Sequence, residues 1–373
     1  MDWPLIISGL GVGIIFGYTL QHGRFCMNTA FREVLLSRDF TVFRIYIVAL
    51  LILILGANGL EAAGILKLKA VPFTWLANVL GGYIFGIGMV LGGGCATGTL
   101  YRVGEGMIGS WFAALGFLLA AASTLSGVLN PIAKFFWFGP GFDPSNIASA
   151  KFMYTVVDAD GNLLPVTIYS ILGVNRWLVI AILAVPALIF IAKGNFKRPA
   201  NQKGFSWWFT GILIGLIGIA AFYASQIWGG YPEARGLSFS GPLNELSAWF
   251  TGAAKFEAIR KTAAQAQVQE VSSIVGPLGT LTWSVWMIFG LVLGSFVSAF
   301  KNKEFSWRAP KAQSLVTQFS GGLIMGFGAT LAGGCNVGHG LTGLSTLALG
   351  SLVGIIFIIL GSWTMVYFLF IRE

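Results

Sequence analysis

The sequence predicts an all-α integral membrane protein with about nine long transmembrane helices, short re-entrant half-helices and pseudo-twofold inverted repeats. Hydrophobic residues make up 56% of the 373-residue chain and charged residues only 10%, whereas soluble domains carry about 25% charged residues. The mean hydropathy is +0.79. Since so few charges could not cover the surface of a soluble domain, the chain is expected to lie in a bilayer.

Nine apolar runs have about the length that a helix needs to cross the hydrocarbon core, roughly 17–25 residues. The run at the N-terminus has no basic segment before it and no small-residue cleavage site after it, so we expect a retained span rather than a signal peptide. Two other runs are short and interrupted by glycine, those at 74–92 and 318–333. The nine expected spans are 3–20, 43–60, 74–92, 107–127, 177–193, 204–225, 281–300, 318–333 and 346–370.

The chain is expected to form a single transmembrane transport domain over residues 1–373. The two longest polar stretches cover about 128–176 and 226–280, and the second holds a predicted amphipathic helix over 253–269. We divide the domain into a first repeat half, a connecting region and a second repeat half, at 1–127, 128–203 and 204–373.

Lysine and arginine residues are distributed unequally between the two sets of loops. Loops after the first, third, fifth and seventh spans, with Arg372 and the span-end residues Arg44 and Lys193, carry fourteen of them, whereas the short loops opposite carry only Lys67 and Lys69. Short cytoplasmic loops are enriched in these residues. We therefore predict a multi-pass protein of the inner (cytoplasmic) membrane, with its N-terminus outside and its C-terminus cytoplasmic. The net charge of +9 reflects this bias, and no nucleic-acid partner is expected.

An internal repeat links residues 81–98 with residues 321–338. At a constant offset of 240, ten of eighteen positions are identical, and Cys95 aligns with Cys335. Five spans separate the two copies, and an odd number reverses direction through the membrane. The halves are therefore expected to be inverted repeats, as in many transporters. The third cysteine, Cys26, has only a weak match, to Ser306.

Each repeat copy reads as an apolar helix, a Gly-Gly-Cys break and a second apolar segment. Broken helices in membranes leave backbone N–H groups that favour anions, and glycine allows close approach of a ligand. A lone membrane cysteine is more often a small apolar filler, but a cysteine repeated within the only recognisable motif favours a site. The candidate transport residues are Cys26, Cys95, Cys335, Gly93, Gly94, Gly333, Gly334 and Arg24.

Other polar residues near the breaks are expected to have ordinary structural roles. Arg102 and Glu105 are predicted to form a surface ion pair, and His22 and His339 to bond nearby backbone. Three cysteines far apart do not indicate a disulfide framework. No cofactor, resident metal or catalytic residue is expected.

At these residues the sequence resembles the YeeE/YedE family of sulfur transport proteins, and most closely its YeeE-type thiosulfate importers. The resemblance covers nearly the whole chain and is carried by residues 21–26, 81–86, 92–98, 101–111 and 333–335. It implies an hourglass-like bundle in which thiosulfate passes three cysteines, mapping here onto Cys26, Cys95 and Cys335. It also implies a separate cytosolic TusA-like (YeeD-type) thiol protein as a partner, since this sequence stops at Glu373.

The resemblance implies thiosulfate uptake rather than enzymatic activity, and neutral thiols suit this substrate. Thiosulfate is a dianion with a soft terminal sulfur, and an S–H group is a weak donor. Weak sequential contacts let an ion leave as well as enter. Burial in an apolar wall favours the protonated thiol, which does not repel the dianion.

Three alternatives remain open at this stage. The transported species could be another sulfur or selenium compound, including a different sulfur oxyanion. A membrane sulfurtransferase could form a persulfide, although that needs an activated thiolate and no Cys-His-acid pattern is visible. Three thiolates would also suit Cu(I), but the glycine-rich breaks favour anions.

Overall fold

The computed structural model describes residues 3–69, 73–140, 151–154, 156–157, 163–164, 166–194, 204–250 and 281–372. Within these residues, eight helices are long and apolar enough to cross a membrane, and the only strands form two short two-stranded sheets. The prediction of an all-α integral membrane protein is confirmed. The amphipathic helix expected over 253–269 lies outside the described residues.

The long helices follow the predicted spans closely. They are α1 (Trp3–Gly23), α3 (Thr41–Ala62), α4 (Trp75–Leu91), α6 (Ile108–Leu125), α9 (Arg176–Ala192), α10 (Trp207–Ile227), α13 (Trp283–Lys301), α14 (Ala312–Ala332) and α15 (Leu349–Val366), which η3 (Tyr367–Ile371) extends. The helices α4 and α9 both have 17 residues, but α4 continues into the next apolar segment, so α9 is the one expected span that is shorter than the eight long candidate spans. The prediction that the span at 318–333 is short was wrong, because α14 begins six residues earlier, at a polar first turn whose low hydropathy concealed it.

Four short helices supplement these spans and correspond to the expected half-helices. The short helix after α1 forms one long apolar segment with α1, and the short helix after α4 forms another with α4. The short helices are α2 (Met27–Leu36), α5 (Ala96–Gly104), α11 (Ser240–Phe250) and η2 (Gly338–Gly343).

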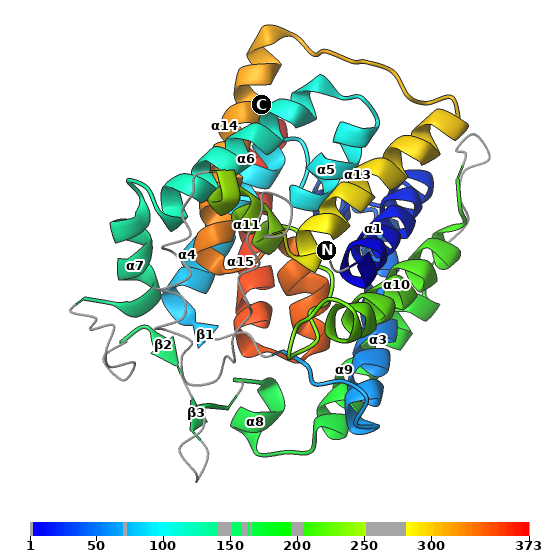
Figure 1. Cartoon of the computed structure of the whole chain (residues 1–373), viewed down its shortest axis with the longest axis vertical. Helices are drawn as coiled ribbons and strands as arrows, with labels where there is room; N and C mark the ends of the chain where they lie inside the picture. The colour runs from blue at the N-terminus through cyan, green and yellow to red at the C-terminus, as the bar shows by residue number, and fades with distance from the viewer. Residues whose placement is uncertain are drawn as a thin grey trace.

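The long helices pack in two matched sets, as Figure 1 shows for α1 beside α13 and α3 beside α10. Glycines along α1 meet successively later residues of α13, so these two helices are parallel, and α10 is likewise parallel to α3. In contrast, α4 crosses α14 in the antiparallel sense, and each also packs on a partner from the other half: α4 on α15, and α14 on α6. This exchange of partners is the inverted repeat expected from the sequence.

Glycine permits the closest of these contacts. A Cβ added at Gly88 of α4 would lie 2.8 Å from the Met325 Cα of α14, and one added at Gly13 of α1 would lie 2.9 Å from the Gly290 Cα of α13. Small residues let membrane helices approach in this way. The high glycine content therefore serves the packing between the two halves.

The connecting region after α6 contributes short elements rather than another repeat. A two-stranded sheet joins the segment before α4 to this region (Figure 1), and α8 begins with a capping box at Thr167. The elements are β1 (Phe73–Thr74), β2 (Met153–Tyr154), β3 (Val156–Val157), β4 (Leu163–Leu164), α7 (Asn130–Phe138) and α8 (Ile168–Leu172).

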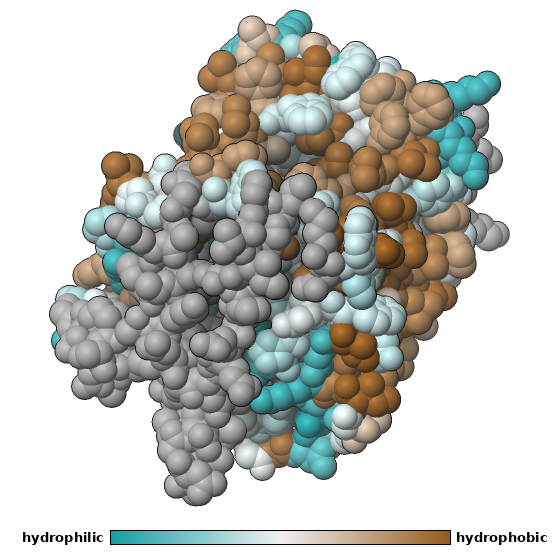
Figure 2. Space-filling view, viewed as in Figure 1, coloured by the Kyte–Doolittle hydropathy of each residue, from teal (hydrophilic) through white to brown (hydrophobic). Residues whose placement is uncertain are grey.

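The bundle has two ends, which we name by a residue at each. At the Glu304 side, α1 and α13 end, α6 and α14 begin, and the connection from α13 to α14 runs across the top of Figure 1. At the Lys67 side, Lys67 N–H donates to Gln226 Oε1 and Ile168 N–H donates to Leu347 O. Figure 2 shows hydrophobic side chains along much of the visible flank between these ends, which suits contact with membrane lipid.

Candidate transport site

Each of the three cysteines lies at the start of a short helix. Cys26 is the N-cap of α2, Cys95 is the N-cap of α5, and Cys335 lies directly before the helical segment that leads into η2. The Gly98 N–H donates to Cys95 Sγ at 3.2 Å, and the Gly338 N–H donates to Cys335 Sγ at 3.4 Å. In both bonds the sulfur is the acceptor, so neither bond uses the S–H proton of its thiol.

The structure brings two of the predicted cysteines together. Cys26 and Cys95 line one cavity of about 10 Å³, and both sulfurs face Gly98, whose added Cβ would lie 3.1 Å from Cys26 Sγ and 3.3 Å from Cys95 Sγ. Cys335 is fully buried but does not line this cavity. The rest of the lining consists of Phe16, Leu20, Phe25, Met27, Thr97, Gly98, Tyr101, Val337 and Leu341.

The cavity between Cys26 and Cys95 is small and almost entirely apolar. Its volume of about 10 Å³ is that of roughly one water molecule. Thiosulfate is larger than water, so the walls must move apart before an anion could occupy the cavity. The side chains that close it come from both halves, with Tyr101 on α5 and Leu341 on η2.

The two Gly-Gly-Cys breaks have matching backbone geometry. The φ angles of Gly93 and Gly333 are +71° and +75°, a left-handed conformation that costs other residues roughly 1–2 kcal/mol. The following glycines accept a close side chain: an added Cβ at Gly94 would lie 3.2 Å from Arg102 Nη1, and one at Gly334 would lie 2.7 Å from His339 Nε2. Glycine is therefore required in both pairs, first for conformation and then for space.

Arg102 braces the first break, a role that the sequence reasoning missed. Its guanidinium donates to Gly93 O rather than pairing with Glu105, so the predicted surface ion pair was wrong. Arg102 lies seven residues, or two helical turns, after Cys95 and therefore on the same face of α5. This seven-residue spacing from Cys95 is the sequence signal that could have placed Arg102 beside the break. Its positive charge beside the break favours an anion there.

His339 braces the second break. Its Nε2 lies 3.1 Å from Ala332 O and its Nδ1 lies 3.2 Å from Ser351 Oγ. Because a carbonyl can only accept, Nε2 carries the proton and Nδ1 accepts from the hydroxyl. The predicted bond to nearby backbone is confirmed, and neither ring nitrogen is free to act as a base toward Cys335.

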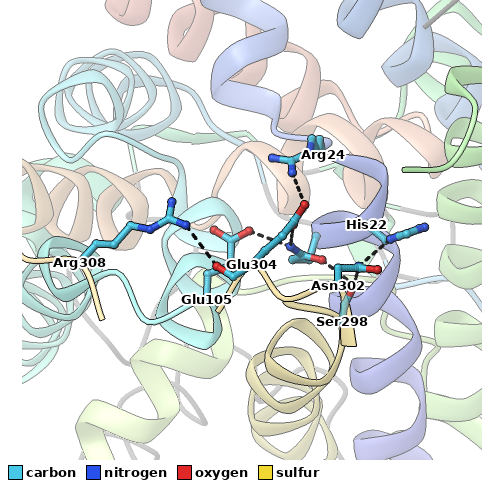
Figure 3. A network of polar contacts seen from close by, with 8 residues as sticks. His22, Arg24, Glu105, Ser298, Asn302, Glu304 and Arg308 are labelled. Atoms are coloured by element: carbon cyan, nitrogen blue, oxygen red, sulfur yellow. Dashed lines mark hydrogen bonds and ion pairs between the residues drawn. The ribbon is translucent and has the colours of Figure 1, made fainter. Parts of the chain in front are cut away.

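Arg24 lies in a polar network at the Glu304 side, outside the lining of the cavity (Figure 3). Its Nη2 lies 2.5 Å from Glu304 Oε1, and its own backbone is left-handed with a φ of +51°. Buried Gln21 donates to Glu304 Oε2 at 2.8 Å and to Glu105 Oε1 at 3.2 Å, and accepts from Ser298 Oγ at 2.5 Å. The network therefore joins the ends of α1, α5 and α13.

Two further contacts extend this network. His22 Nδ1 lies 2.9 Å from Asn302 Nδ2, and Arg308 Nη2 donates to Glu304 O at 3.2 Å (Figure 3). Burial raises the pKa of the Glu105 carboxyl above its usual range, against the opposing effects of its bond from Gln21 and of nearby arginines. This end of the bundle thus concentrates charged groups that the apolar cavity lacks.

Comparison with known proteins identifies the family. A family model described as sulphur transport matches residues 22–364, a range that contains all three cysteines and both breaks. The chain belongs to this sulphur transport family. The family resemblance expected from the motifs is therefore confirmed.

Full-length relatives within the family are described as transporters. The thiosulfate transporter TsuA of Spirochaeta thermophila is 35% identical over 370 residues, which cover 99% of this chain and 100% of the relative. TsuA of Escherichia coli is 30% identical over 373 residues, covering 99% and 96%. A probable transporter, YedE of Salmonella typhimurium, is 30% identical over 123 residues, covering 32% of this chain and 30% of that protein.

Proposed function

We propose that this chain takes up thiosulfate across the cytoplasmic membrane along a central path lined by Cys26, Cys95, Cys335 and the two Gly-Gly breaks. The observation that carries the proposal is the inverted pair of breaks, each with a buried thiol at the start of a short helix. Two full-length relatives described as thiosulfate transporters support this choice of substrate.

The chemistry of the breaks fits a soft dianion. Helix N-termini attract negative charge, and Arg102 adds a cation beside the first break. The sulfurs of Cys95 and Cys335 each accept an amide proton, which leaves their S–H groups to donate weakly to the terminal sulfur of thiosulfate. Weak contacts at successive thiols hold the ion briefly at each and release it to the next.

The proposal includes an orientation and a partner. The Glu304 side faces the cytoplasm, the N-terminus lies outside and the C-terminus inside, as the lysine and arginine distribution predicts. Single cysteines replacing exposed Lys67 and Lys311 should react with an impermeant maleimide from outside and from inside, respectively. Labelling with the reverse pattern contradicts the orientation. A cytosolic TusA-like thiol protein is the partner we expect on the cytoplasmic side.

The decisive experiment is uptake of thiosulfate labelled with ³⁵S in its outer sulfur, in cells lacking other importers. Wild-type cells should accumulate label, and the recovered ion should keep its S–S bond. Mass spectrometry of the purified protein after exposure to thiosulfate should show no added sulfur on any cysteine. A stoichiometric gain of one sulfur atom would instead support a sulfurtransferase, and absent uptake would reject thiosulfate as the substrate.

A further inference from the structure

The surroundings of the two cysteines differ at one position. The sequence repeat aligns Gly98 with Gly338. At Gly98 the two nearest atoms to an added Cβ are the sulfurs of Cys26 and Cys95. At Gly338 an added Cβ would lie 3.4 Å from Ser238 Oγ and 3.8 Å from Cys335 Sγ. Ser238 therefore stands beside Cys335 where Cys26 stands beside Cys95.

The topology supports the same correspondence independently. The packing of α1 with α13 mirrors that of α10 with α3, so α10 and α11 are the inverted equivalents of α1 and α2. Cys26 lies directly before α2, and Ser238 lies two residues before α11. Ser306, the weak match suggested by the sequence, follows α13 and is not the spatial equivalent of Cys26.

The segment that carries Ser238 is anchored to the second break. Thr342 of η2 donates its hydroxyl hydrogen bond to Leu237 O, and an added Cβ at Gly236 would lie 2.7 Å from the Thr342 side chain. Ser238 itself is half-buried. Its hydroxyl is thus held toward Gly338 while remaining partly accessible.

We propose that Ser238 is the specificity-determining partner of Cys335. A hydroxyl is a stronger and harder donor than a thiol, so Ser238 suits the sulfonate oxygens and Cys335 suits the terminal sulfur. The second break then selects an ion that carries both groups. This inference rests on the proposed function and adds a determinant of substrate selectivity at the second break.

Kinetics of uptake into proteoliposomes test the role of Ser238. Ser238→Ala should raise the KM for thiosulfate about 10-fold, the loss of one hydrogen bond to an anion, while the maximal rate stays within about twofold of wild type. Ser238→Cys, which copies the Cys26 position, should recover part of this loss. The control is Ser320→Ala, whose exposed hydroxyl bonds only to Val316 O in its own helix and whose KM should not change.

Cross-linking tests the geometry without transport. In Ser238→Cys, mild oxidation by diamide should join residues 238 and 335 in a disulfide found by peptide mass spectrometry, and thiosulfate should slow its formation. Failure of wild type to take up thiosulfate would reject the proposed function. With working wild type, an unchanged KM in Ser238→Ala, a fall in maximal rate alone, or no cross-link would each overturn this inference.

Discussion

At the first break a thiol, Cys26, faces Cys95, whereas at the second a hydroxyl, Ser238, faces Cys335. The bracing side chains differ as well, since the charged guanidinium of Arg102 supports the first break and neutral His339 supports the second. The backbone is nearly the same in both, with a left-handed glycine and a glycine that admits the bracing side chain. The two copies share the backbone geometry that places a buried thiol at the start of a short helix, but they differ in the charge of the bracing side chain and in whether a thiol or a hydroxyl lies beside the cysteine.

Removing either repeated thiol should have the largest effect. Cys95→Ala and Cys335→Ala should each lower thiosulfate uptake about 100-fold or more, because each removes a donor to a dianion in a buried site. Growth on thiosulfate as the sole sulfur source and ³⁵S uptake measure this, with membrane insertion checked by immunoblot. Wild-type growth of either inserted variant would show that the breaks are structural only.

Adding a methyl group at each of the two equivalent glycines should lower uptake more at the first break than at the second. Gly98→Ala places a Cβ 3.1 Å from Cys26 Sγ, whereas Gly338→Ala meets nothing closer than 3.4 Å. Overpacking costs roughly 1–3 kcal/mol, so we expect uptake to fall about 10-fold in Gly98→Ala and less than about threefold in Gly338→Ala. The matched control is Gly59→Ala in α3, where the added Cβ meets nothing within 4 Å. Equal loss at both sites would contradict the asymmetry.

Removing the positive charge of Arg102 should have a smaller effect on thiosulfate uptake. Arg102→Gln keeps an N–H donor but removes the positive charge, so the KM for thiosulfate should rise about fivefold, the order expected from the loss of one nearby charge. The control is Arg372→Gln, since Arg372 lies at the exposed end of η3. A KM in Arg102→Gln equal to that of the control would mean that the guanidinium only supports the backbone.

The smallest effect concerns Glu105 at the Glu304 side. Because burial raises the pKa of this carboxyl, its contribution to stability is full below the ordinary carboxyl range and is lost as pH rises through the raised pKa. The Tm of the detergent-solubilised wild type should therefore fall, relative to Glu105→Gln, by a few degrees between pH 4.5 and 8. Parallel Tm curves for the two proteins across this pH range would show that the carboxyl does not titrate there.

Much of the architecture follows from local features of the sequence. Apolar length predicts the spans to within a few residues, except where polar residues begin α14. The Cys95–Cys335 repeat and the odd number of intervening spans predict the inversion. The limits of the two repeat halves, at 127 and 204, remain predictions.

The sequence by itself determined the membrane fold, the inverted copies and the glycine-cysteine breaks, because hydropathy and a short repeat are local properties of the chain. Only the tertiary structure decided which groups meet at each break. Ser238 lies 97 residues before Cys335 in the chain, and Cys26 lies 69 residues before Cys95; they correspond only because α10 and α11 fold as the inverted equivalents of α1 and α2. No local pattern marks a serine as the counterpart of a cysteine when packing alone sets their positions.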